Sequence, residues 1–400
     1  MMRMALKQIN IILFSGTLFF ILCGTFLVPF SPHIISKMLV ISCLAGIVNF
    51  CFGDKKCLGV SNKEIYLCVV IYVVVIMLSR FVHSDSSWIY RNLLYLMLFF
   101  YLIPRDKLVI YSIKAGSIIG GISIGVMALW QYHNGILRAD GFSNAILFAQ
   151  GALVLSIVNG FFCKKETRLS IKIIYFVSVM LSITAIYLSQ SRGVWISLLF
   201  IFIVLLTLMA RKHPLVSISL LFLGVLILIY SFSEGGVLRG RLEESLTELS
   251  MITNNNYNSS WGLRIMAWRS AWHGFIEHPI LGIGLDGFKL LPQQQLKDGI
   301  VNDFYVSYNI EHAHNQFMQN MVIRGIPGLV GAIAIFIYPA ILFIRLAGFA
   351  SAGCMVVLGM LVCALSDVPM EQQNTSYMYV TVLFLLCFLY EGNGEEGDDI

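Results

Sequence analysis

The chain is dominated by a series of apolar segments, each about as long as a helix needs to cross a lipid bilayer. A bilayer core of about 30 Å needs roughly 20 apolar residues per helix, and backbone amides within it must be bonded inside their own segment. The predicted fold class is therefore all-α, a polytopic membrane protein with about 12 transmembrane helices. The segments lie near residues 9–29, 34–53, 65–82, 88–103, 108–131, 145–163, 170–189, 193–210, 214–232, 326–346, 349–366 and 375–390.

Composition supports a lipid-solvated protein and excludes several other classes. Hydrophobic residues make up 58% of the chain, charged residues 12%, and the mean hydropathy is +0.81. A soluble domain carries about 25% charged residues. The net charge of +5 is dispersed between apolar spans, so no nucleic-acid partner is expected. The cysteines form no CxxC or Cys/His pair with metal spacing, which predicts neither a disulfide framework nor a zinc site.

Basic residues mark one set of alternate loops, and this predicts the orientation in the membrane. The other short loops are nearly free of lysine, so the basic set is cytoplasmic and both termini lie inside. Three regions follow: residues 1–232 hold helices 1–9, residues 233–325 form a periplasmic loop, and residues 326–400 hold helices 10–12 and an acidic cytoplasmic tail. The basic loops contain Arg3, Lys7, Lys55, Lys56, Lys63, Arg105, Lys107, Lys164, Lys165, Arg168, Arg211, Lys212 and Arg345.

Five arginines disobey the orientation rule, because they fall near the outer face: Arg80, Arg91, Arg138, Arg192 and Arg264. A guanidinium binds phosphate or carboxylate through two parallel hydrogen bonds, so this cluster suits an anionic lipid headgroup such as a polyprenyl diphosphate. The alternative is that each arginine snorkels at a helix end or pairs with an acidic neighbour. That alternative is favoured for Arg80 and Arg91, and less so for Arg192, which separates two apolar spans.

The outer loop contains a predicted helix with an aromatic face. Asn258-Ser259-Ser260 is typical of a helix start, and Pro279 of a stop. Between them Trp261, Ile265, Trp268, Trp272 and Phe275 recur at three- and four-residue spacing. This face fits a helix in the membrane interface or one packed against other spans, and the pattern alone favours neither. The glycine-rich residues 281–288 predict a tight turn rather than a dinucleotide site.

The strongest local signal is Glu311-His312-Ala313-His314-Asn315. If helical, the two histidines point to nearly opposite sides, so only one is expected to face a common cavity. No metal site is expected without a third ligand. A histidine titrates near neutrality and is a natural general base, although an interfacial histidine without chemistry is also possible from residue type alone.

These residues together resemble the bacterial O-antigen ligase family and its relatives, the O-antigen polymerases. The resemblance covers the number of spans, the cytoplasmic termini and a large periplasmic loop late in the chain. Each local match is short, but their order and their placement at one face make the set more specific. The matching stretches are Arg138 to Asn144, Ser191 to Trp195, Gly262 to Arg264 with the helix that follows, His312 to Asn315 with Gly325 and Gly328, and Leu365-Ser366-Asp367-Val368.

The resemblance implies a function and roles for individual residues. Such a ligase resides in the inner membrane and transfers a glycan from undecaprenyl diphosphate to a sugar hydroxyl of lipid A–core at the periplasmic face. It needs no nucleotide, metal or other cofactor. The family's essential histidine maps onto His314 and its essential arginines onto Arg192 and Arg264, while Arg138 is a looser match. Possible supporting residues are His312, Asn315, Glu311, Arg80 and Arg91.

Three other functions are alternatives to the ligase. A polymerase, which joins repeat units on the same lipid carrier, is poorly separated from a ligase by sequence. A lipid-linked sugar transporter predicts charged residues along several spans, whereas here the mid-span regions are almost free of charge. A structural scaffold leaves the clustered outer arginines unexplained. No obvious carboxylate partner for His314 appears in the sequence, although Glu311 lies one turn before it.

Overall fold

The computed structural model describes residues 2–52, 59–233 and 236–395, and the regular elements in these ranges are all helical. The α-helices are α1 (Met2–Gly24), α2 (Ser31–Phe52), α3 (Lys63–His83), α4 (Trp88–Leu102), α5 (Lys107–His133), α6 (Ala145–Lys165), α7 (Leu169–Leu188), α8 (Arg192–Ala210), α9 (Pro214–Ser231), α10 (Val237–Thr253), α11 (Ser260–Glu277), α12 (Gly284–Lys297), α13 (Asp303–Ser307), α14 (Gln316–Ala347), α15 (Ala352–Ala364) and α16 (Gln373–Glu395). A 3-10 helix, η1 (Pro369–Glu371), precedes α16. The all-α prediction is confirmed.

Nine helices within the described ranges are long and apolar enough to cross a membrane: α1, α2, α3, α5, α6, α7, α8, α9 and α14. Two further apolar helices, α4 and α15, are shorter. The last predicted span falls on α16, whose first turn is polar (Gln373-Asn374-Thr375). Each predicted span therefore lies on a helix, but the count of about 12 spans is not confirmed. The fold is that of a multi-pass membrane protein.

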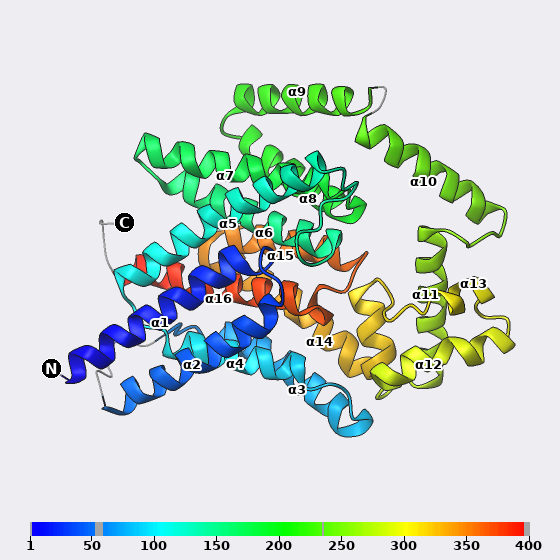
Figure 1. The fold of residues 1–400 in the computed structure, drawn as a ribbon, viewed down its shortest axis with the longest axis horizontal. Coiled ribbons are helices and arrows are strands. Elements are labelled where there is room, and N and C mark those ends of the chain that lie inside the picture. Colours follow the sequence, from blue (N-terminus) through cyan, green and yellow to red (C-terminus); the bar gives the residue numbers. More distant parts are fainter. Residues whose placement is uncertain (1, 53–58, 234–235, 396–400) are drawn as a thin grey trace.

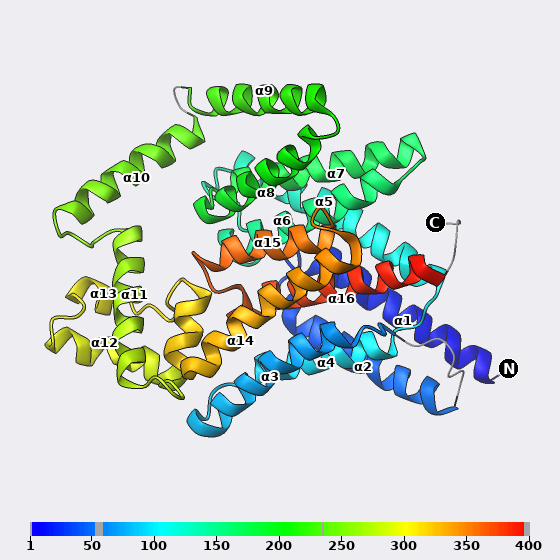
Figure 2. The same cartoon turned by 180° about the vertical axis from the view of Figure 1, so that it is seen from behind.

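Helix α16 lies inside the bundle, between α1, α4, α14 and α15 (Figures 1 and 2). Its residues from Tyr377 to Cys387 are buried, and aromatic contacts join it to its neighbours. The rings of Phe384 and Phe100 stack with centroids 5.1 Å apart, and those of Tyr379 and Phe336 lie 5.4 Å apart. By contrast, α9 lies at the edge with most of its leucines and isoleucines exposed, as a lipid-facing helix requires.

Helices α10 to α13 project from one end of the bundle, and the start of α1 and the end of α16 lie at the other (Figures 1 and 2). Both views show α11 running across the bundle axis rather than along it. The predicted outer loop and the termini are thus at opposite ends, while the side that is cytoplasmic remains a prediction. Lys55, Lys56 and the last acidic residues, Asp398 and Asp399, lie outside the described residues.

Helix α14 is two helical pieces joined at Gly325, which has φ +64° and ψ −154°. A Cβ at this position would lie 2.4 Å from the carbonyl oxygen of Ile280, so only glycine fits. The amide of Ile326 donates to Pro279 O at 2.9 Å and closes the joint. The turn after α11 has φ +69° at Gly282 and +73° at Gly284, but the turn predicted over residues 281–288 is shorter than expected, because α12 already begins at Gly284. This joint separates the spanning part of α14 from a short helix, Gln316 to Arg324, that carries the site.

Candidate functional site

His312 and His314 lie together in a loop before α14, with ring centroids 4.3 Å apart. The prediction that they point to opposite faces of a helix is wrong, because this segment is not helical. One ligand atom from each of His312, His314 and Asp367 lies within 4.8 Å of the other two. The structure therefore brings a carboxylate from the loop between α15 and η1 to both imidazoles.

The backbone around His314 turns its ring toward Asp367. His314 has φ +48°, the left-handed region that non-glycine residues rarely occupy. Such conformations cost about 1–3 kcal/mol and cluster at functional sites. The next residue, Asn315, caps α14 by accepting from Phe317 N and Met318 N. Its Nδ2 also donates to Leu365 O at 3.0 Å, so the histidine loop and the Asp367 loop are bonded directly.

Asp367 is buried and its Oδ2 accepts a hydrogen bond from Gln150 Nε2 of α6 at 2.9 Å. Burial raises the pKa of this carboxyl group, against the opposing effects of His312, Gln150 and Arg264. Glu311, the carboxylate that the sequence suggested beside His314, is instead exposed, and its side chain forms no hydrogen bond or ion pair with the described residues. The acidic partner comes from 53 positions further along the chain, and sequence spacing gave no signal for it.

The environment of His314 keeps its imidazole neutral. Burial, then His312, then the Arg264 guanidinium lower the pKa of His314 to about 3. The imidazole is therefore neutral at physiological pH and has a lone pair to offer. Nδ1 of His314 and Nδ1 of His312 are both buried without a hydrogen-bond partner in the described part of the chain.

Arg264 lies between Asp367 and the Arg192–Glu248 pair. Burial lowers the pKa of Arg264. The nearby carboxylates of Asp367 and Glu248 raise this pKa, and the positive charge of Arg192 lowers it. Helix α11 begins as predicted: Ser259 Oγ accepts from Gly262 N at 3.1 Å. Over residues 2–52, 59–233 and 236–395, Arg264 makes no hydrogen bond or ion pair, so its five donors are available to a ligand.

Arg192 differs, because it has protein partners. Its Nη1 donates to Ser245 Oγ at 2.7 Å, its Nη2 to Glu248 Oε1 at 3.1 Å, and the guanidinium lies 5.5 Å from the Trp261 ring centroid. It is the first residue of α8, where the helix dipole disfavours a cation, and buried Glu248 compensates. The acidic-neighbour alternative thus applies to Arg192. Glu248 is a site residue that the sequence did not reveal.

The motif around Arg192 and the loop of Asp367 are in close contact. A Cβ at Gly193 would lie 2.2 Å from Ser366 Oγ, so the glycine lets the start of α8 approach the residue before Asp367. Arg138 reaches the same region from the loop after α5, since its Nε donates to Ser189 O at 3.2 Å. Burial is the largest cause that lowers the pKa of Arg138. The positive charges of Arg241, Arg192 and Arg264 lower it further. Arg138, Arg192 and Arg264 therefore lie close enough to influence one another, as a basic cluster near the outer-loop end requires.

Arg241 belongs to this cluster and was missed, because in the sequence it looks like one half of a surface i,i+3 pair. Its Nη1 does contact Glu244 at 2.5 Å, but the side chain is only 15% exposed. In the part of the chain that the structure describes, Arg80 and Arg91 form no hydrogen bond or ion pair with the residues of the histidine site. Arg80 instead donates through Nη1 to Asp85 O at 2.5 Å, which is the helix-end role of the alternative interpretation.

The aromatic face of α11 is not its packing face. The buried residues are Leu263, Met266, Ala267, Ala271 and Gly274, on the adjacent side of the helix. The aromatic stripe is only partly buried, and Trp272 is 48% exposed. A half-buried aromatic stripe on a helix that crosses the bundle axis fits the membrane interface better than the core (Figure 1).

A metal ion is one group that His312, His314 and Asp367 could hold. Three ligands with an open fourth position are typical of catalytic zinc. However, Arg264 lies close enough to lower the pKa of His314, and its positive charge opposes a cation there. The surroundings favour an anionic ligand over a metal.

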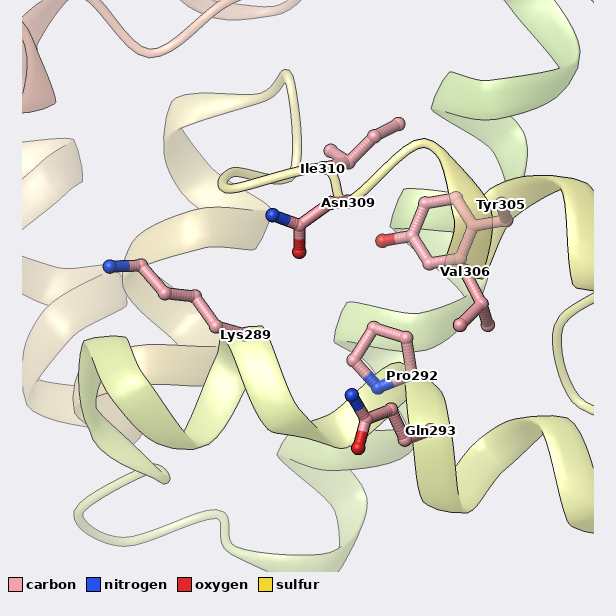
Figure 3. Close-up of a pocket in the computed structure, with 7 residues that line it drawn as sticks. All are labelled: Lys289, Pro292, Gln293, Tyr305, Val306, Asn309 and Ile310. Atoms are coloured by element: carbon pink, nitrogen blue, oxygen red, sulfur yellow. The ribbon is translucent and has the colours of Figure 1, made fainter.

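A separate hollow lies between α12 and the loop after α13 (Figure 3). It encloses about 260 Å³ of open space, and none of the predicted site residues lines it. Its lining residues are Lys289, Pro292, Gln293, Tyr305, Val306, Asn309 and Ile310. The site at the histidines is therefore distinct from this hollow.

The fold and the site define a class: a multi-pass membrane protein with a histidine–carboxylate cluster and several arginines at one end of its helix bundle. Residues 177–333 match the model of the O-antigen ligase family. The matched segment contains Arg192, Arg264, His312 and His314. The chain is also 24% identical over 326 residues to an uncharacterized protein of Haemophilus influenzae, with 77% of this chain and 79% of the relative covered. The match over residues 177–333 favours a glycosyltransferase-like membrane enzyme.

Proposed function

We propose that the protein is an O-antigen ligase of the inner membrane, with its site facing the periplasm. It would transfer a glycan from undecaprenyl diphosphate to a sugar hydroxyl of lipid A–core. The observation that carries the proposal is the convergence of neutral His314, buried Asp367 and unpaired Arg264 at the end of the bundle that bears α10 to α13. A base and an anion-binding group side by side are what glycosyl transfer from a diphosphate needs.

The chemistry balances with these groups alone. His314 accepts the proton of the acceptor hydroxyl as its oxygen attacks the anomeric carbon of the donor sugar, a role worth roughly 10²–10⁴-fold in rate. The bond from that carbon to the diphosphate oxygen breaks, and the electron pair stays on the leaving diphosphate. Arg264 stabilises the developing charge with a bidentate guanidinium. Because the diphosphate is already a good leaving group, no nucleotide or metal is required.

The two essential arginines of the family would then act differently. Arg264 has free donors and would contact the diphosphate directly. Arg192 is held by Ser245 and Glu248, and would act chiefly through its charge and by fixing α10 against α8. The prenyl chain of the donor would remain in the surrounding lipid, where α9 already exposes an apolar surface.

Deletion of the gene separates the ligase from the polymerase. Loss of a ligase leaves lipid A–core without O-antigen, while polymer accumulates on undecaprenyl diphosphate. Loss of a polymerase leaves core capped by one repeat unit. Gel analysis of the lipopolysaccharide measures this, and the single-repeat pattern would replace our proposal by the polymerase.

A further inference from the structure

A second buried charge cluster lies on the same short helix as the site, at the joint of α14. Arg324 and Glu371 form a bidentate pair, with Nη1–Oε1 2.6 Å and Nη2–Oε2 3.0 Å. Their side chains are 4% and 8% exposed. Tyr72 donates to Glu371 Oε1 at 3.3 Å, and Arg324 Nη1 also donates to Asn320 Oδ1. Neither charged residue takes part in the proposed transfer.

The pair is one of three bonds that hold the Asp367 loop to the start of α14. Before Asp367, Asn315 Nδ2 donates to Leu365 O at 3.0 Å. After it, Met370 N donates to Gln316 Oε1 at 2.8 Å, and Glu371 receives the Arg324 guanidinium. Between Leu365 and Gln372 the only regular element is the three-residue η1, so the position of the loop depends on these bonds together with the Gln150 bond to Asp367.

The same short helix also holds the histidine loop. Gln319 Oε1 accepts from Ala313 N, between the two histidines, at 2.7 Å. Arg324 is the last residue before Gly325, where close backbone contact with Ile280 fixes the direction of the chain. One rigid helix, Gln316 to Arg324, thus carries the base at its start and anchors the carboxylate loop at its end.

Stability alone does not account for this buried pair. Replacing a buried ion pair by apolar groups of similar volume is often neutral or stabilising, whereas breaking it by removing one partner is costly. A bidentate pair fixes the orientation of the guanidinium relative to the carboxylate. Apolar contacts do not fix the orientation of two groups in this way. Here that orientation sets where Asp367 stands relative to the imidazoles.

We propose that Arg324 and Glu371 form a positioning pair that fixes Asp367 against His312 and His314 in the transfer site. They touch no substrate and act through Asp367. The role rests on the proposed function, because the histidine–carboxylate cluster is taken as the proton acceptor. The groups that face His314 are His312, Arg264 and Asp367.

The test is the double variant Arg324→Met/Glu371→Leu in the full-length protein, which removes both charges and leaves none unpaired. The matched control is Arg345→Met/Glu64→Leu, because Arg345 and Glu64 form an exposed Arg–Glu pair at the other end of α14, with α3 as the partner element. Transfer is measured in detergent with undecaprenyl-diphosphate glycan as donor, alongside thermal stability. Titration of His312 and His314 is followed by NMR of histidine-labelled protein.

We expect the double variant to fold with near wild-type stability, to lose roughly tenfold to a hundredfold in kcat and to keep KM for the donor, since a misplacement of about 1 Å can cost that much. The histidine titration should shift as Asp367 moves away. The control variant should match the wild type in every readout. Wild-type transfer with unchanged histidine titration would overturn the positioning role, as would lost transfer with an unchanged titration.

Two further variants separate the possible outcomes of this test. If the double variant does not fold, Arg324→Lys, which keeps the charge and loses the bidentate fork, is judged by the same two readouts. If His314→Ala retains full transfer, the proposed function fails. The NMR titration, which needs no turnover, then still decides whether the pair positions Asp367.

Discussion

Two charge clusters lie at the two ends of the short helix from Gln316 to Arg324, and they differ in how completely their charges are satisfied. At Arg324 and Glu371 both Nη nitrogens and both carboxylate oxygens are paired, and Nε of Arg324 is the one atom of this pair without a partner within the described residues. Around His314, two imidazole nitrogens and the Arg264 guanidinium have no partner within the described residues. A buried polar group without a partner costs roughly 1–3 kcal/mol, so a ligand that bonds to the two imidazole nitrogens would remove that cost. The paired cluster orients the segment that carries Asp367, and the unpaired one is available to substrate.

The largest effect is expected at the unpaired cluster itself. His314→Ala should lower transfer by roughly 10²–10⁴-fold, because the proton acceptor is removed. His312→Ala and Asp367→Asn should each lose a large part of transfer, since the three groups are in mutual contact. Purified variants assayed in detergent provide the measurement. Full activity in His314→Ala at normal protein level would show that the unpaired cluster is not the reaction centre.

Arg192 has protein partners and Arg264 has none within the described residues, so these two arginines provide a second test of the comparison. Arg264→Lys should lose roughly a hundredfold in transfer, the typical cost of removing one charge-stabilising donor. Arg192→Lys keeps the charge facing Glu248, and should lose less activity. The two variants are compared for turnover and for thermal stability. Equal losses in both would contradict the distinction drawn here between a ligand-binding and a protein-bound arginine.

The titration of His314 provides a third, smaller effect. Its pKa of about 3 means that the folded protein leaves it neutral between about pH 3 and pH 6.5, while the unfolded chain binds a proton there. This group therefore makes stability rise with pH across that window. Removing a positive neighbour by Arg264→Met should move the pKa upward. NMR of labelled histidine measures both; a wild-type midpoint near 6.5 would show that His314 is not buried beside Arg264.

Metal removal is expected to have the smallest effect. Incubation with EDTA, followed by gel filtration, should leave transfer unchanged, because Arg264 opposes a cation at His312, His314 and Asp367. The positive control is addition of Zn²⁺ after treatment. Loss of transfer on chelation with recovery on Zn²⁺ would show that the cluster is completed by a metal rather than by the donor's diphosphate.

Much of the local structure followed from the sequence. The apolar segments predicted helices, the Ser259 cap and Pro279 predicted the limits of α11, and the glycine-rich residues after it predicted a tight turn. The relation between the histidines could not be predicted in this way. A period-based argument assumes a helix, and the segment from 308 to 315 is a loop whose course is set by the left-handed His314 and the Asn315 cap.

What the sequence determined by itself is the environment of the chain and the residue types at its functional end. Lipid requires long apolar helices whatever their neighbours are, and charge is costly enough there that misplaced arginines stand out. Only the tertiary structure decided which of those charges are already paired. Glu248 lies on α10, whereas Asp367 and Glu371 lie in the segment between α15 and α16, and their contacts with Arg192, His312 and Arg324 depend on how the helices pack. Packing joins residues that are distant along the chain, and spacing in a single sequence carries no information about that.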